Sequence, residues 1–233
     1  MLDNGSTDNS WRIIPNKEIL DRFQQPPSKV DLEKTINNLE LEGIVGNSII
    51  FLTVSRLIVA KNIEKMLRAF AMTTNKSPNI FYLIAGEGPL RSHLERLVQL
   101  LGIEEKVRFL GYVPHNELRC LYHISDVFYY ATLYEGQPRV IVEALLSNLP
   151  IICTNYGQVC EVVEYGMDGL WVDPNDIESI TDAIIQLASD ANLRNKMSEH
   201  TGFDAQQFSV EQVSEQEAAL YLATIQKHCK RRK

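Results

Sequence analysis

The chain has 233 residues, of which 45% are hydrophobic and 23% are charged, so it can bury a full core and fits one domain or a domain with appendages. Its net charge of -7 argues against a general nucleic-acid binder, because that affinity depends on surplus lysine and arginine. No run approaches the ~20 apolar residues that cross a bilayer, and the N-terminus lacks the basic-then-apolar order of a signal peptide. We therefore expect a cytoplasmic protein with neither membrane span nor secretion.

The first 27 residues are polar and irregular and end in "QQPPS". This composition predicts a linker, or the stub of a missing N-terminal domain, ahead of one folded domain over residues 28–233. The four cysteines, Cys120, Cys153, Cys160 and Cys229, show no metal-ligand spacing, which favours buried or incidental thiols over a zinc site or a disulfide framework.

Six short apolar runs, each bounded by polar, glycine or proline residues, are typical of fully buried strands. They cover residues 48–54, 80–85, 106–111, 126–131, 150–154 and 169–172. Helical periods lie between them, as in 62–75 and 90–102, and three more are expected at 176–190, 192–201 and 209–227. Strand followed by helix, six times over, predicts an α/β fold with a mostly parallel sheet covered on both faces.

The loops that follow the strands are the place to look for a ligand site, because open parallel sheets bind ligands beyond the carboxyl ends of their strands. Four such loops carry charges or glycines: "SRLIVAKN" (55–62), "GEGPL" (86–90), "TLYEGQPRVIVEA" (132–144) and "NYGQVCE" (155–161). Any one of them alone is most simply explained as solvated charges or turn glycines. Together at one sheet edge they favour a binding site.

The stretch "YEGQPRVIVEAL" (134–145) places one carboxylate on each side of an expected helix start. Pro138 suits the first turn, so we predict a helix from Pro138 to Leu146. Its N-terminus then offers an anion site, formed by the amides of Gly136, Gln137 and Arg139. Glu143 lies ~7.5 Å further along the axis, and Glu135 precedes the helix. Carboxylates accept from vicinal hydroxyls, so this order of polyol, phosphate and polyol predicts a nucleotide sugar.

A glycosidase is the alternative interpretation of the two glutamates. Spacing alone allows Glu135 and Glu143 to act as acid and nucleophile, because such pairs need only ~5 to 9 Å between carboxyl groups. That reaction gives no role to Arg56 or Lys61, whereas two cations suit a departing diphosphate. They can replace Mg²⁺ there, and the ligand loops hold no acidic pair of the DxD type, so we expect no metal and no other cofactor.

The order of the motifs, including "LGYVPHNEL" (110–118) and "GLWVDPND" (169–176), resembles the donor-binding C-terminal half of the retaining group 1 (family 4) glycosyltransferases. The resemblance runs from about Ile14 to Asp190. It implies a GT-B fold, in which two Rossmann-like domains with doubly wound sheets face each other. It further implies that Arg56 and Lys61 grip the donor diphosphate, with Glu143 on the ribose and Glu135 on the transferred sugar. The implied donor-site residues are Ser55, Arg56, Lys61, Gly86, Gly88, Val113, Glu135, Gly136, Gln137, Pro138, Arg139 and Glu143.

Some positions depart from the family pattern. Gln137, Pro138 and Arg139 replace an apolar or glycine-rich turn, Lys17 stands where glycine is usual, and Gln158 and Cys160 replace glycine and proline. The sugar pocket is therefore not the common one, and the hexose cannot be inferred from it.

Length is the largest departure, because a complete enzyme of this family carries a preceding acceptor-binding domain of similar size. Two functions follow: a glycosyltransferase donor domain, or a module that holds a nucleotide sugar without transferring it. The partners expected are a UDP- or GDP-sugar, a saccharide or lipid-linked acceptor and a separate acceptor-domain protein. The isolated chain is expected to be inactive. The basic tail "KHCKRRK" (227–233) is most simply a solvated end, with contact to the inner membrane face as the alternative.

Overall fold

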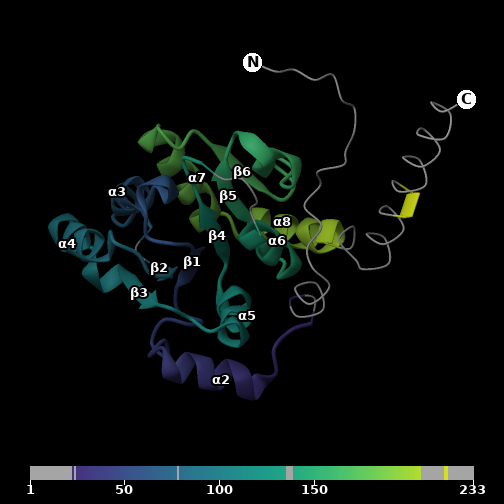
Figure 1. The fold of residues 1–233 in the computed structure, drawn as a ribbon, viewed down its shortest axis with the longest axis horizontal. Helices are drawn as coiled ribbons and strands as arrows, with labels where there is room; N and C mark the ends of the chain where they lie inside the picture. Colours follow the sequence, from purple (N-terminus) through teal and green to yellow (C-terminus); the bar gives the residue numbers. More distant parts are fainter. Residues whose placement is uncertain (1–22, 24, 78, 135–138, 206–217, 220–233) are drawn as a thin grey trace, which may run out of the picture.

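The computed structural model describes residues 23, 25–77, 79–134, 139–205, 218 and 219 (Figure 1). Within these residues, no helix combines the length and the apolar character needed to cross a bilayer. The predicted helix at 209–227 and the basic tail lie outside the described residues, except for residues 218 and 219.

Six parallel strands form one sheet in the order β3-β2-β1-β4-β5-β6. The strands are β1 (Ile49–Val54), β2 (Ile80–Ala85), β3 (Val107–Gly111), β4 (Val127–Tyr130), β5 (Ile151–Thr154) and β6 (Gly169–Val172). Because the chain starts at the centre and winds first one way and then the other, the sheet is doubly wound. The predicted α/β, Rossmann-like fold is confirmed.

Seven α-helices are assigned among the described residues. They are α2 (Lys29–Asn38), α3 (Ile63–Thr73), α4 (Arg91–Leu101), α5 (His115–Ile124), α6 (Arg139–Leu146), α7 (Ile177–Ser189) and α8 (Ala191–Ala205). α4 ends at Gly102, as predicted, because this residue takes the left-handed conformation that suits glycine. α6 contains the described part of the helix predicted from Pro138.

The expected alternation of strand and helix fails at one crossover. Between β5 and β6 the chain forms only a 3-10 helix, Gly157–Glu161, in place of an α-helix. Gly157 and Gly166 both have positive φ, at 71° and 77°, so two turns occupy this short connection and leave little length for a helix.

The core has two parts, one on each face of the sheet. α3, α4 and α7 cover the face that carries Phe51, Tyr82 and Tyr129. α5 and α6 cover the face that carries Leu52, Phe128 and Tyr130, and Figure 1 shows α3 and α4 on the opposite side of the sheet from α6. The strands are therefore covered on both faces, as their continuous apolar sequences predict.

The segment before α2 also touches the core. Ser28 caps α2, since its hydroxyl accepts a hydrogen bond from the Asp31 amide. Upstream of the cap, Phe23 is 3% exposed and belongs to the cluster under α5 and α6. At least one residue of the predicted linker at 1–27 therefore packs on the domain.

Candidate functional site

The site is built at the carboxyl edge of the sheet, where the loops after β1 and β2 are joined by backbone hydrogen bonds. The Ser55 amide donates to the Ala85 carbonyl at 3.0 Å, and the Leu57 amide donates to the Glu87 carbonyl at 2.9 Å. The Leu90 amide returns to the Leu57 carbonyl at 3.1 Å. These bonds continue the strand pairing into the loops, so the residues that follow β1 are held by those that follow β2.

Two glycines permit this close approach. A Cβ at Gly86 would lie 1.9 Å from the Ser55 carbonyl oxygen, and one at Gly88 would lie 2.4 Å from that of Leu57. Gly86 also has φ +133°, a conformation that other residues rarely adopt. Both predicted site glycines thus have a structural reason to be glycine, and their contact with a donor stays a prediction.

The chain reverses its winding direction between β1 and β4, which is where a doubly wound sheet opens a crevice for ligands. Here the Thr132 hydroxyl donates to the Ala60 carbonyl at 2.8 Å. The buried Asn62 side chain donates to the carbonyls of Ala131 and Pro174 at 2.9 and 2.8 Å. The loops after β1, β4 and β6 are thereby connected at this switch point.

Lys61, the last residue of the 3-10 helix Val59–Lys61, lies at this switch point. Its ammonium group donates to the Tyr130 hydroxyl at 2.8 Å, and the nitrogen lies 5.3 Å from the centroid of the same ring. Arg56 lies earlier in the same loop and is exposed. The two cations predicted to bind a diphosphate therefore belong to one loop, which follows β1 at the switch point.

Glu143 lies inside the second turn of α6 and is only 4% exposed. Its Oε2 accepts a hydrogen bond from the Tyr122 hydroxyl of α5 at 2.9 Å. Burial, and then the charge of Glu143, raise the pKa of Tyr122 well above its ordinary value, so the phenol stays protonated. Glu143 is therefore held in the interior by α5 and α6, and its contact with ribose hydroxyls stays a prediction.

The remaining predicted site residues lie along the same edge or outside the described residues. Val113, after β3, is buried; Ser55 is partly exposed and its hydroxyl donates to the Arg56 carbonyl; Arg139 is the exposed first residue of α6. Glu135, Gly136, Gln137 and Pro138 lie outside the described residues, so the anion site expected at the start of α6 stays a prediction.

Sequence reasoning missed Tyr122 and Tyr130, the two partners of the charged residues. A signal was available in "VFYY" (127–130), because a tyrosine in a buried strand needs a polar partner for its hydroxyl. The identity of that partner depends on tertiary structure.

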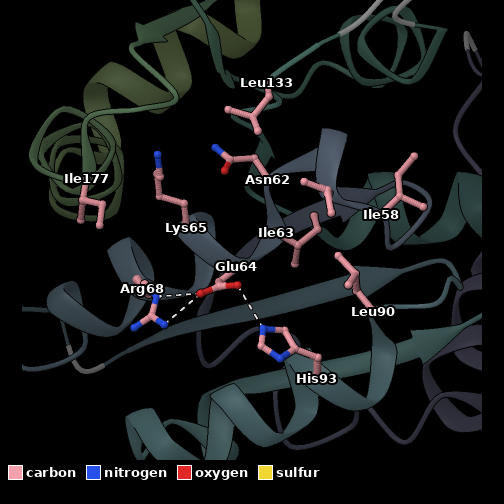
Figure 2. A pocket seen from close by; sticks show the side chains of 11 residues that line it. Ile58, Asn62, Ile63, Glu64, Lys65, Arg68, Leu90, His93, Leu133 and Ile177 are labelled. Carbon is pink, nitrogen blue, oxygen red and sulfur yellow. Dashed lines mark hydrogen bonds and ion pairs between the residues drawn. The ribbon is translucent and has the colours of Figure 1, made fainter.

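A cavity of about 550 Å³ opens beside the β1 loop (Figure 2). Its apolar wall is formed by Ile58, Val59, Ile63, Leu90, Leu133 and Ile177. At its rim, Glu64 bonds to Arg68 and His93, at 2.9 and 3.0 Å, as the dashed lines in Figure 2 show. Hydrogen bonds from Arg68 and His93 lower the pKa of Glu64.

In the part of the chain that the structure describes, no group of three or more His, Cys, Asp or Glu side chains is arranged to hold a metal.

Comparison with known proteins decides the family. Residues 36–201 match the sequence profile described as "Glycosyl transferases group 1". The chain belongs to this family. An uncharacterized glycosyltransferase of Methanocaldococcus jannaschii is 30% identical over 251 aligned positions, which cover 94% of this chain and 59% of that protein.

Solved structures agree with the fold. The UDP complex of Alr3699/HepE from Anabaena superposes with a TM-score of 0.74 at 22% identity, over 88% of this chain and 55% of that one. The C-terminal domain of a group 1 glycosyl transferase family protein (LpcC) from Francisella tularensis gives 0.69 at 23% identity, over 82% of this chain and 98% of that domain. The chain thus spans about half the length of the curated relatives it matches, from 41% to 59%, and it covers 98% of one crystallised C-terminal domain.

Proposed function

We propose that this chain is the donor-binding domain of a retaining, family 4 glycosyltransferase with the GT-B fold. In this role it binds a UDP- or GDP-sugar, and an acceptor domain outside the given sequence, on the same or on another polypeptide, presents a saccharide or lipid-linked acceptor. The observation that carries the proposal is the position of Lys61 at the switch point of a doubly wound sheet. The UDP bound to the Anabaena neighbour supports a nucleotide as the ligand.

The chemistry follows from the charges. Transfer breaks the bond between the anomeric carbon and the phosphate oxygen and forms one to the acceptor oxygen on the same face of the sugar. The acceptor proton passes to the leaving phosphate, so no protein nucleophile is needed. Arg56 and Lys61 stabilise the negative charge on the leaving diphosphate, each by about 4 kcal/mol at 4 Å and an effective dielectric near 20, before desolvation is subtracted. These cations take the part that Mg²⁺ plays in metal-dependent transferases.

A binding module that holds the nucleotide sugar without transferring it is the second candidate. Binding requires the same donor-side residues as transfer, so the two candidates differ only in whether an acceptor site is completed. In both cases we propose a cytoplasmic location, with contact between the basic tail and anionic lipid at the inner membrane face as the alternative to a solvated tail.

Thermal unfolding with nucleotides tests donor binding. UDP or GDP at a hundred times its Kd should stabilise the fold by roughly 2.7 kcal/mol, with or without EDTA. Arg56→Ala or Lys61→Ala should remove the shift. Lys76→Ala and Arg96→Ala, which remove exposed cations elsewhere on the domain, serve as controls and should retain it. Loss of the shift in EDTA would contradict the metal-free site, and no shift with either nucleotide would contradict the proposal.

A transfer assay separates the two candidates. The chain alone should show at most slow donor hydrolysis, because we assign the acceptor site to a separate domain. Transfer needs an acceptor hydroxyl within ~3 to 3.5 Å of the anomeric carbon, an arrangement worth about 7 to 11 kcal/mol. Purified chain is incubated with nucleotide sugars and a membrane or saccharide extract, with and without a candidate acceptor-domain protein. Turnover only with the partner supports the split enzyme, and no turnover in either case supports the binding module. Rapid transfer by the chain alone would show that the acceptor site lies within this chain, which would contradict the proposal of a separate acceptor domain.

A further inference from the structure

Two tyrosines on the α5–α6 face of the sheet are joined through one phenylalanine. Tyr122 of α5 and Tyr130 of β4 both contact Phe128, with ring centroids 5.5 and 5.7 Å apart, and the Tyr130 ring is stacked on it. Tyr122 is fully buried and Tyr130 is nearly so. Because close-packed cores hold side chains in single rotamers, the position of each hydroxyl is restrained by the packing of its ring.

Each of these hydroxyls contacts one charged residue of the predicted donor site. The Tyr122 hydroxyl donates to the Glu143 carboxylate, and the Tyr130 hydroxyl accepts from the Lys61 ammonium group. Glu143 is the residue proposed for the ribose, and Lys61 is one of those proposed for the diphosphate. Glu143 and Lys61 are therefore each bonded to a tyrosine whose ring packs against Phe128.

We propose that Tyr122 and Tyr130 are positioning residues of the nucleotide-sugar site, Tyr122 holding Glu143 for the ribose hydroxyls and Tyr130 holding Lys61 for the diphosphate. The inference rests on the proposed function. Neither tyrosine is assigned a contact with the donor, and each acts through the charged residue that it bonds.

The role of Tyr122 follows from the burial of Glu143. A carboxylate out of water is costly unless hydrogen bonds stabilise its charged form. A phenol that stays protonated supplies such a bond at every physiological pH, and it also fixes the carboxylate rotamer. Carboxylate oxygens accept hydrogen bonds from a ribose diol, so a Glu143 side chain held in one orientation favours nucleoside binding.

Phe23 adds support on the other side of Tyr122. Its ring meets that of Tyr122 edge to face, with centroids 5.5 Å apart and planes at 90°. Phe23 precedes α2, so the segment that enters the domain contributes to holding the tyrosine that bonds Glu143.

The role of Tyr130 follows from the flexibility of lysine. The four-carbon side chain of Lys61 has rotamer entropy that is lost when a ligand immobilises the ammonium group. Because the Tyr130 hydroxyl already restrains that group before a ligand binds, less entropy is lost on binding a diphosphate. The bond also places the cation beside the switch-point crevice, so the lysine is oriented before the ligand arrives.

Hydroxyl deletions and a pair of ligands test the inference. The variants are Tyr122→Phe, Tyr130→Phe and, as a matched control, Tyr129→Phe, whose buried hydroxyl bonds to the Met66 carbonyl on the opposite face. Calorimetry measures Kd for the diphosphate that the wild type binds, UDP or GDP, and for its 2′,3′-dideoxy analogue. All variants keep the aromatic ring, and their melting curves establish that they fold.

The expected pattern differs between the two tyrosines. Tyr122→Phe should raise the Kd for the normal diphosphate about tenfold and that for the dideoxy analogue less than twofold. Only the normal diphosphate has ribose hydroxyls for Glu143. Tyr130→Phe should weaken both ligands about fivefold, because both carry the diphosphate. Tyr129→Phe should leave both within twofold. A structural role alone would not separate the two ligands.

The opposite results are equally clear. Unchanged affinities in both Tyr122→Phe and Tyr130→Phe, with a wild type that binds, would overturn the inference while leaving the proposed function intact. Equal loss of both ligands in Tyr122→Phe, or comparable loss in Tyr129→Phe, would indicate general loosening and would also overturn it. If the wild type binds neither nucleotide, the proposed function fails and the inference fails with it.

Discussion

The two faces of the sheet each bury a pair of tyrosines, and the two pairs bond to different kinds of partner. On the α3–α7 face, Tyr82 and Tyr129 have ring centroids 5.3 Å apart. The Tyr82 hydroxyl shares a 2.8 Å bond with that of Thr53, and the Tyr129 hydroxyl donates to the Met66 carbonyl at 3.0 Å. These partners are neutral groups of the core itself. On the opposite face, Tyr122 and Tyr130 bond to a carboxylate and an ammonium group.

The hydroxyls of the first pair only need a hydrogen-bond partner in the core, whereas those of the second pair bond to charged side chains. Burial raises the pKa of Tyr82 and Tyr129, so both phenols stay neutral. Their hydroxyls are hydrogen-bonded to neutral groups, so no charge is buried with them. Bringing ionised side chains into the interior costs free energy that well-packed apolar residues would not cost. Stability alone therefore does not explain the buried carboxylate of Glu143 on the second face, whereas a role in holding the ribose hydroxyls of the proposed nucleotide sugar would explain it.

Truncating the aromatic rings is the change with the largest expected effect on this comparison. Tyr129→Ala and Tyr122→Ala should each lower the free energy of unfolding by about 3–5 kcal/mol, because both remove a fully buried ring. Urea denaturation followed by circular dichroism measures the loss. A cost for Tyr122→Ala far below that for Tyr129→Ala would mean that the second face is loosely packed and cannot position a charge.

The two glutamates that flank the start of α6 sharpen the comparison next. Glu143→Ala should weaken UDP or GDP by roughly 10- to 100-fold, since bonds to a charged group are worth about 1.5–3 kcal/mol. Glu135→Gln should leave the free diphosphate nearly unchanged and weaken only the nucleotide sugar, because its proposed contact is with the transferred sugar. Titrations of both variants with both ligands measure this. Equal losses for the free diphosphate would contradict the division between ribose and sugar.

The elements of the fold could be predicted because buried parallel strands have a distinctive sequence. Continuous apolar runs bounded by polar, glycine or proline residues predicted the observed bounds of β2 and β6. For the other four strands, each predicted end lies within one residue of the observed end. The crossover after β5 was the exception, since apolar residues such as Val159 and Val163 are buried without an α-helix.

The site was less predictable, because its contacts join distant residues. The edge and the charged residues of the loops follow from the topology of a parallel sheet. The bond between Lys61 and Tyr130 spans 69 positions, and that between Tyr122 and Glu143 spans 21. Periodicity also marks the face of a helix that carries Glu143 without showing how deeply that face is buried.

The smallest expected effect concerns charges that stay in water, at the rim of the cavity in Figure 2. Glu64, Arg68 and His93 are each about half exposed, so solvent screens their interaction, and Glu64→Gln should cost only about 0.5 kcal/mol near neutral pH. Because the folded pKa of Glu64 lies below its ordinary value of 4.5, its contribution is present above that value and is lost as the pH falls through the lowered pKa. Urea midpoints of wild type and Glu64→Gln should therefore differ slightly at about pH 7 and converge by about pH 3, with a smaller difference in high salt. A difference that persists in acid, or one as large as the loss from a buried tyrosine, would show that this rim is coupled to the core and that the contrast between exposed and buried charges does not hold.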